Sequence, residues 1–317
     1  MAKIIKSKLP TSEKTKISDA YELFLGSRKL LCAKATYESY KNEGERIILP
    51  YLLKYCDSGY IEDVTAIVIR TALSDYEETH SKGGKLFMFR YLKSFINWYW
   101  NEYEIDDIAN PVSNIKLKKV NTPPKEGITR EEVDKLLRAA KNQKFPERDI
   151  AMLMILCDTG IRLSSLMGLK IQDINLSKSQ LFIFAKDQDF HVKSFGASTG
   201  RAIRRYLNCL EEVKPEDTFW YTFEGAPLTK SGMVSELVRL CKNAGIKIHR
   251  FHDFRRFYGL ELYNSTHDIY FVSRALNHKN IEVTKRYLAI NTQEDAEIAR
   301  LYSPMDNRMV TINRKKK

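Results

Sequence analysis

Cysteine is scarce in this sequence, and the few that occur form no pattern. Five are spread over 317 residues, at Cys32, Cys56, Cys157, Cys209 and Cys241. There is no C-x-x-C pair and no group of cysteine and histidine with the spacing of zinc ligands. An odd, scattered set of this kind argues against a zinc module and against a disulfide framework. We therefore expect reduced thiols in a cytoplasmic protein.

Long apolar runs and repeats are also missing. No stretch approaches the roughly 18 consecutive apolar residues that a membrane-spanning helix needs. The opening residues, M-A-K-I-I-K-S-K, carry no extended apolar segment either. We find no internal repeat, and the one low-complexity tract is the basic end of the chain, residues 314–317. We expect a soluble intracellular protein with no membrane partner.

Positive charge exceeds negative charge, and the excess is uneven. Lys and Arg number 52 against 40 Asp and Glu, a net charge of +12. Residues 1–121 have a net charge of +3, and residues 122–317 have one of +9. A field of this sign attracts polyanions, so nucleic acid is the leading candidate partner. The length, with 43% hydrophobic residues, suffices for two domains.

The N-terminal part has the apolar spacing that helices require. Apolar residues recur at helical intervals across residues 13–109, and we expect Gly83 and Gly84 to break this pattern. Residues 87–100, F-M-F-R-Y-L-K-S-F-I-N-W-Y-W, form the most aromatic segment. These rings could stack on bases, but in a small helical domain aromatic rings more often form the core. We favour the core.

A basic linker precedes the marked start of a second domain. Residues 112–127 lack periodicity and contain four lysines and two prolines. Such a linker usually lies in solvent, although this one could follow a DNA backbone. Thr129 and Glu132 then have the spacing of a capping box at the start of a helix.

The second domain is expected to be mainly helical with one β-hairpin. Residues 146–160 predict a helix that ends at Gly160, because glycine readily adopts the left-handed conformation that closes a helix. A further helix begins close to Arg162. Residues 180–184 and 190–195 are rich in β-forming residues and predict the two strands of a hairpin. More helices are expected at residues 199–210, 230–244, 253–264, 268–276 and 281–288.

Two histidines, an arginine and a tyrosine gather in the last part of this domain. His252 and Arg255 stand three residues apart, so in a helix they share one face. Tyr287 lies nine residues beyond His278. Hydrogen-bond donors and a cation placed where a tyrosine hydroxyl can also reach suit a phosphate diester. Attack by a phenol builds negative charge on the phosphoryl oxygens, which fixed arginines can stabilise, and a lysine can protonate the leaving sugar oxygen.

In its motifs the chain resembles the tyrosine recombinases, the family that includes phage integrases and Xer-type recombinases. T-G-I-R-L-S-S-L at residues 159–166 is similar to the family's first arginine motif, H-D-F-R-R at 252–256 to its H-x-x-R motif, and L-N-H at 276–278 to its L-G-H motif. The turn F-A-K-D-Q-D resembles the family's hairpin lysine motif. It favours Lys186, with Lys193 on the opposite strand as the alternative. The resemblance thus implies six catalytic residues: Arg162, Lys186, His252, Arg255, His278 and Tyr287.

The resemblance implies that three of these residues hold the scissile phosphate. Arg162 and Arg255 would clamp it, and His278 would form a hydrogen bond with it. Ser165 departs from the family, which often has an acidic residue three positions after the first arginine. No cofactor and no metal is expected, because a two-metal site needs clustered carboxylates and only Asp253 lies inside these motifs.

The other three residues would move protons and make the covalent bond. By resemblance, Tyr287 attacks the phosphate, His252 is the base or proton shuttle, and Lys186 protonates the departing 5′ oxygen. The product is a 3′-phosphotyrosyl link. A 5′ hydroxyl of another strand can reverse the step without ATP, because the bond energy is kept in that link.

The fold that the resemblance implies is mainly α, with a small β-hairpin or sheet in the C-terminal domain. A helical core-binding domain and an α-rich catalytic domain would clamp double-stranded DNA, and copies of the chain would assemble on it as a tetrameric synapse. Accessory DNA-bending proteins are further candidate partners. The C-terminal helix would dock on a neighbouring protomer or on its own domain. The expected parts are residues 1–111 for the core-binding domain, 112–127 for the linker, 128–291 for the catalytic domain, and 292–317 for the C-terminal helix and basic tail.

Other functions use similar chemistry. A type IB topoisomerase or a telomere resolvase also combines a tyrosine with two arginines, and a regulator that had lost activity would only bind DNA. Intact Arg162, Arg255 and Tyr287 argue against the regulator. Strand exchange between paired sites separates a recombinase from a topoisomerase, which relaxes plasmid without a specific site. We favour an integrase-like, site-specific DNA recombinase of a mobile element, associated with DNA in the cytoplasm.

Overall fold

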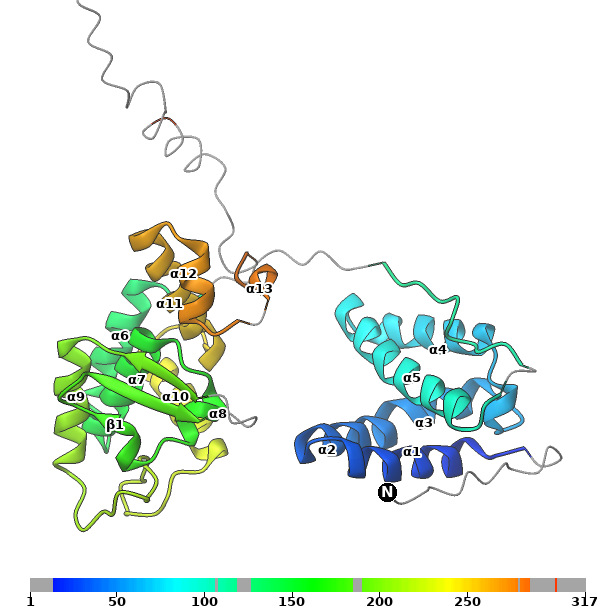
Figure 1. Ribbon diagram of the computed structural model, residues 1–317, viewed down its shortest axis with the longest axis horizontal. Helices are drawn as coiled ribbons and strands as arrows, with labels where there is room; N and C mark the ends of the chain where they lie inside the picture. Colours follow the sequence, from blue (N-terminus) through cyan, green and yellow to red (C-terminus); the bar gives the residue numbers. More distant parts are fainter. Residues whose placement is uncertain are drawn as a thin grey trace, which may run out of the picture. The chain divides into compact units, whose positions relative to one another are not determined.

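The protein consists of two compact units, Met1–Asn121 and Thr122–Lys317, each with its own hydrophobic core. This computed structural model describes residues 14–105, 108–118, 127–184, 190–278, 280–285 and 300. Both units are mainly helical, and the second also holds a small antiparallel sheet (Figure 1). The fold class expected from the sequence is therefore confirmed. Within the ranges described, every helix is too short or too polar to span a membrane.

The first unit is a set of helices around an aromatic core. Its helices are α1 (Ile17–Leu31), α2 (Lys34–Glu43), α3 (Leu49–Tyr55), α4 (Ala66–Thr79) and α5 (Lys82–Glu102), with a π-helical segment at Gly44–Ile48. The aromatic segment of residues 87–100 lies on α5. Phe89, Phe95, Tyr99 and Trp100 are buried there. The prediction that this segment forms core is confirmed, because buried rings cannot stack on the bases of a nucleic acid.

Gly83 and Gly84 do not break the chain, so that expectation was wrong. Both lie in the first turn of α5, where Ser81 accepts a hydrogen bond of 3.2 Å from the backbone N–H of Gly84. The first N–H groups of a helix have no partner inside it, and a capping side chain supplies one. The cap and the buried residues that follow offset the helix-forming penalty of glycine, which is about 1 kcal/mol per residue.

The segment expected as a linker is packed at its start. Val112 and Ile115 are buried in the core of the first unit. The two units divide between Asn121 and Thr122. Residues 119–126 of the expected linker lie outside the described part of the chain.

The second unit combines helices with one small sheet, of which one face is buried and the other is largely exposed. The sheet has the strand order β1 (Ile174–Asn175), β2 (Gln180–Phe184), β3 (Phe190–Ser194), and both pairings are antiparallel. The helices are α6 (Arg130–Ala140), α7 (Pro146–Thr159), α8 (Leu163–Met167), α9 (Ala197–Leu207), α10 (Lys230–Asn243), α11 (Phe251–Thr266), α12 (Ile269–Ala275) and α13 (Ile281–Lys285). The expected hairpin is present, and its strands lie within one residue of the predicted bounds.

The central helix of the second unit is α7, which packs against α6, α9 and α11. It ends at Gly160, whose φ of 56° is left-handed, as the sequence predicts. Arg162 follows two residues later as the N-cap of α8. The start of α6 is also as predicted, because Thr129 and Glu132 form a complete capping box.

The register of the hairpin decides which side chains of β3 face the interior. Lys193 pairs with Leu181, and His191 pairs with Ile183. Leu181, Ile183 and Lys193 are buried, and His191 is half-buried, whereas Val192 is exposed. Alternation along the strand therefore turns one lysine and one histidine inward.

Replacing Gly160 by alanine is expected to destabilise the second unit by about 2 kcal/mol or more. The positive φ strains the backbone of an alanine, and its methyl group would also clash with a neighbouring side chain. Its Cβ would lie 2.5 Å from Cδ1 of the Tyr258 ring. Gly245→Ala is the matched control, since its φ is also positive at 66° but a Cβ there meets nothing within 4 Å. Urea unfolding followed by tryptophan fluorescence, to which Trp220 contributes from the second unit, measures both. Equal losses in the two variants would show that close packing at Gly160 is unimportant.

Candidate active site

Arg255 lies at the centre of the candidate site and is buried. It projects from the second turn of α11 and is 2% exposed. Its Nη1 donates a hydrogen bond of 2.8 Å to the carbonyl of Gly160, and its Nη2 donates to the carbonyl of Leu276. A buried guanidinium needs such acceptors, because a buried charge without hydrogen bonds is strongly destabilising. Both acceptors are neutral, so these bonds hold the positive charge in place without cancelling it.

Arg162, the residue just before α8, also reaches the residues at the end of α12. It is exposed, and its Nη2 donates a hydrogen bond of 3.2 Å to the carbonyl of Asn277. Because it directly follows the turn that ends α7, its backbone position is set by a rigid, buried helix. The side chain can still reach solvent, where a ligand would arrive.

Lys193 is the third cation, and it comes from the inner face of β3. It is 9% exposed, and its Nζ donates to the carbonyl of Ala275. Burial, together with nearby Arg255 and Arg162, lowers the pKa of Lys193 to about 8. Proximity to two arginines places this ammonium group in the same positive cluster.

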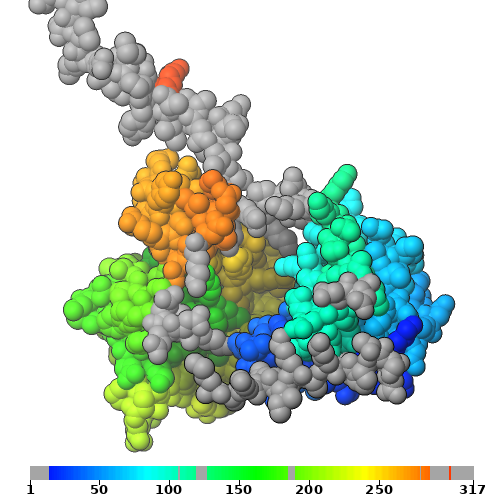
Figure 2. All heavy atoms as spheres, turned by 45° about the vertical axis from the view of Figure 1, so that its right-hand side comes forward, coloured from blue at the N-terminus to red at the C-terminus, as the bar shows by residue number. Residues whose placement is uncertain are grey.

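The carboxyl end of α12 collects all three cations. Its successive carbonyl groups at Ala275, Leu276 and Asn277 accept hydrogen bonds from Lys193, Arg255 and Arg162, respectively. Carbonyls at the end of a helix lack partners in the helix and carry partial negative charge. Figure 2 shows an orange surface, which includes α12 and α13, lying against the green surface of the earlier part of this unit. We call these three side chains the cation cluster.

His278 directly follows these three carbonyls. Its Nδ1 lies 2.8 Å from the Thr284 hydroxyl. Burial, and then Arg255 and Arg162, lower the pKa of His278 to about 4. The ring is therefore neutral near pH 7, and the effect of the arginines shows that it lies among the cations.

His252 stands on α11, one turn before Arg255. Partial burial lowers its pKa, and the neighbouring Arg256 and Arg255 lower it further, while Asp253 acts in the opposite direction. A histidine with a lowered pKa is neutral near pH 7 and can accept a proton. The structure thus brings together Arg162, His252, Arg255 and His278, which were selected from the sequence.

Lys186 and Tyr287 lie outside the described residues. Their roles remain predictions. For the hairpin lysine the sequence favoured Lys186 and kept Lys193 as the alternative. Lys193 is described, and it belongs to the cation cluster.

Sequence reasoning missed two residues that contact the site. The first is His191, which lies on β3 two residues before Lys193. Its Nε2 contacts the side chain of Asn277. Asn277 itself has a φ of 51°, a left-handed conformation that asparagine tolerates and that the glycine common in the family adopts freely. The other residue is Thr284. Only the alternation of β3 could have indicated His191 in advance, and nothing local marked Thr284.

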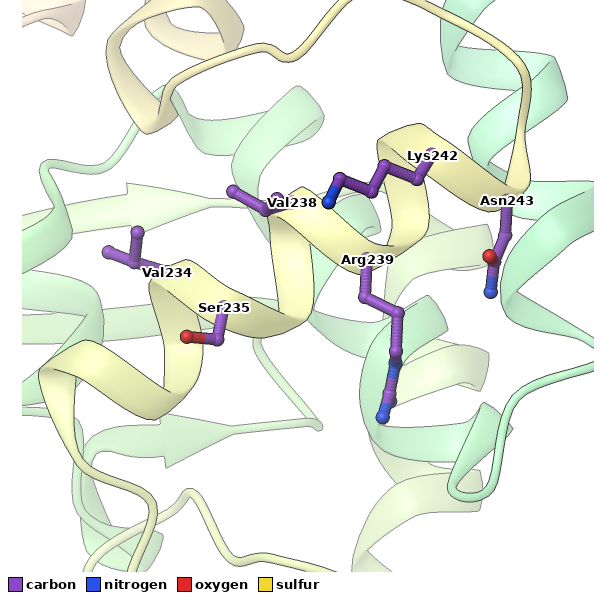
Figure 3. A pocket seen from close by; sticks show the side chains of 6 residues that line it. All are labelled: Val234, Ser235, Val238, Arg239, Lys242 and Asn243. Carbon is purple, nitrogen blue, oxygen red and sulfur yellow. The ribbon is translucent and has the colours of Figure 1, made fainter.

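A separate hollow lies on the surface of α10. It has a volume of about 310 Å³ and is lined by Val234, Ser235, Val238, Arg239, Lys242 and Asn243, all on one helix (Figure 3). None of the clustered residues lines it. The candidate site is therefore an open set of cations rather than this hollow.

The described residues contain no group of three or more His, Cys, Asp or Glu side chains that could hold a metal ion. What the site offers instead is positive charge and hydrogen-bond donors. Such groups suit a phosphate, whose oxygens accept hydrogen bonds and carry negative charge.

Known proteins share both the motifs and the fold. The family model described as "Phage integrase family" matches residues 126–294, more than half of the chain. The chain belongs to the phage integrase family, the tyrosine recombinases. A curated relative, the tyrosine recombinase XerC of Oceanobacillus iheyensis, is 26% identical over 261 residues, which is 80% of this chain and 84% of that protein.

Solved structures of this family have the same fold. The Tn1549 transposon integrase in complex with circular intermediate DNA has a TM-score of 0.69 at 18% identity, covering 90% of this chain and 100% of that one. A lambda integrase dimer bound to a core site has a TM-score of 0.68 at 18% identity, covering 87% of this chain and 77% of that one. The tyrosine recombinase fold thus extends over both units of the chain.

Lys193→Met is expected to stabilise the recombinase at neutral pH, and the gain should shrink in alkali. Below pH 8 the lysine is protonated in the folded and unfolded chain alike, so the full cost of burying its charge is present. Between pH 8 and its ordinary pKa of 10.5, only the unfolded chain holds the proton, so the parent gains stability as pH rises.

Urea unfolding of both proteins at about pH 7 and about pH 9.5 measures this difference. Exposed Lys178 provides the control, because Lys178→Met should cause no pH-dependent difference in the free energy of unfolding. If the free energies of unfolding of the parent and Lys193→Met differ by the same amount at both pH values, the burial of a charged lysine is contradicted.

Proposed function

We propose that this chain is a site-specific DNA recombinase that cuts and rejoins double-stranded DNA through a 3′-phosphotyrosyl intermediate. The observation that carries the proposal is the cation cluster at the end of α12, with His252 and His278 beside it. Family membership supports the same reaction. Acting on DNA, the protein would work in the nucleoid region of the cytoplasm.

The two arginines serve the phosphate. Arg162 and Arg255 donate to its non-bridging oxygens, which gain negative charge as the phenol attacks. Guanidinium groups suit this task because they stay charged and can bind two oxygens at once. In the free protein the same donors rest on main-chain carbonyls. Neutral acceptors are released at lower cost than carboxylates when an anionic phosphate arrives.

Proton transfers balance the making and breaking of bonds. The phenol proton of Tyr287 passes to neutral His252 as the Tyr287 oxygen bonds to phosphorus. The bond from phosphorus to the 5′ oxygen breaks, and a lysine gives that oxygen its proton. Lys186 is the residue that the family motif nominates, and Lys193, whose lowered pKa of about 8 makes it a ready acid, is the alternative.

The substrate and assembly follow the same proposal. Double-stranded DNA would be the substrate, and four copies would form the synapse in which strands are exchanged. Strand exchange needs two paired sites and a 5′ hydroxyl from the other duplex. Relaxation of plasmid without any specific site would instead indicate topoisomerase activity.

Tyr287→Phe is expected to abolish the covalent DNA adduct, because phenylalanine has no nucleophilic oxygen. The assay uses a nicked duplex that carries the target site, which traps the adduct as the cut fragment diffuses away. Tyr270→Phe is the matched control, since Tyr270 is exposed on α12 and should be dispensable. Adduct formation by Tyr287→Phe at the parent level would show that another residue is the nucleophile.

Arg162→Gln should slow adduct formation by about a hundredfold or more, because it removes a donor that acts on charge developing in the transition state. DNA affinity and thermal stability should change little, since Arg162 is exposed and donates to a neutral main-chain carbonyl, that of Asn277. Arg274→Gln, at an exposed position in the last turn of α12, is the control. If both variants lose the same amount of activity, Arg162 contributes only general positive charge.

A further inference from the structure

Thr284 is a buried polar residue whose position the hydrophobic core does not explain. It is 0% exposed on α13, and its hydroxyl lies 2.8 Å from Nδ1 of His278. A buried hydroxyl costs free energy unless it forms a hydrogen bond. The contact therefore contributes to the stability of the fold, and it also constrains the His278 ring.

The chemistry of the ring makes this constraint important. His278 is neutral near pH 7, because burial and the neighbouring arginines lower its pKa to about 4. A neutral imidazole carries hydrogen on only one nitrogen, and the hydrogen bond at one nitrogen decides the state of the other. The oxygens of a phosphate diester only accept hydrogen bonds. A neutral His278 can therefore bind phosphate only through a nitrogen that carries hydrogen.

We propose that Thr284 is a positioning residue of the cleavage reaction. Its hydroxyl donates to Nδ1 of His278 and so keeps the ring hydrogen on Nε2, which donates to a non-bridging oxygen of the scissile phosphate. The inference rests on the proposed function, because it assigns a task within that reaction. It adds a residue that touches neither the DNA nor the nucleophile and acts through His278.

The same contact anchors the chain just before the nucleophile. The helix α13 (Ile281–Lys285) has five residues, too few to be stable by itself. Asn280 caps its start by accepting a hydrogen bond of 2.9 Å from the N–H of Glu282. Thr284 adds a second anchor on the other side, three positions before Tyr287 in the sequence. One hydrogen bond thus orients His278 and holds the segment that leads to Tyr287.

Two substitutions separate the hydroxyl from the shape of the side chain. Thr284→Val keeps the shape and removes the hydroxyl, whereas Thr284→Ser keeps the hydroxyl. We expect Thr284→Val to slow adduct formation about tenfold, as the loss of one hydrogen bond in the transition state does, and Thr284→Ser to stay within about twofold of the parent. DNA affinity should be unchanged in both. Thr266→Val is the control, because the exposed Thr266 hydroxyl contacts only main-chain groups, donating to the carbonyl of Leu262 in the preceding turn and accepting from the N–H of Asp268.

A double-mutant cycle with His278→Gln shows whether Thr284 acts through His278. In that background Thr284→Val should cause no further loss, because the ring that it positions is gone. A tenfold loss in both backgrounds would overturn the proposal and assign Thr284 a packing role. So would a slow Thr284→Ser variant, since it retains the hydroxyl.

Nitrogen NMR of the full chain labelled with ¹⁵N-histidine tests the hydrogen assignment without relying on catalysis. There are six histidines, and His278→Gln identifies the signals of His278. The parent and Thr284→Ser should show a bare Nδ1 and a protonated Nε2, and Thr284→Val should lose this preference. A parent with hydrogen on Nδ1 would contradict the proposal.

The two readouts keep the failure of this inference distinct from the failure of the proposed function. A parent that forms no adduct, but shows the expected Nε2–H form, would refute the recombinase reaction and leave the contact intact. If Thr284→Val forms the adduct as fast as the parent, only the role of Thr284 is refuted, and the proposed function stands.

Discussion

The candidate site depends on holding three positive side chains together without cancelling their charge. Like charges repel, and burial of Arg255 and Lys193 adds a cost of desolvation. A carboxylate would relieve both but would also compete with a phosphate. The chain instead uses the neutral carbonyl groups at the end of α12, one for each cation. Burial, and then the repulsion that remains, lowers the pKa values of Lys193 and His278.

Several local features are needed to bring the cations to these carbonyls. The left-handed turn at Gly160 places Arg162 next to the carbonyl that binds Arg255. The hairpin register turns Lys193 inward, and the positive φ of Asn277 ends α12 so that His278 follows directly. Each feature belongs to a different element. The packed core that joins these elements therefore keeps the cations together.

Most of the fold could be predicted from local sequence patterns. The capping box at Thr129, the terminal glycine at Gly160 and the two β-rich segments have local physical causes, so they could be predicted from the sequence. Gly83 was misjudged because a cap at Ser81 outweighs a weak helix former. The burial of the Lys193 side chain depends on the register of β3, and the role of Thr284 depends on its contact with His278 in another segment. Alternation along β3 could show that His191 and Lys193 share a face, but the burial of that face depends on residues far away in the sequence, and nothing local marks the contact between Thr284 and His278.

The central claim is that Arg162 and its neighbours act by offsetting negative charge on the scissile phosphate. The most direct test gives Arg162→Gln a DNA site in which a neutral methylphosphonate replaces that phosphate. If the claim holds, this variant should cleave the neutral substrate about tenfold or more faster than the natural one, because the charge that it can no longer balance has been removed. Equally slow cleavage of both substrates would contradict the account.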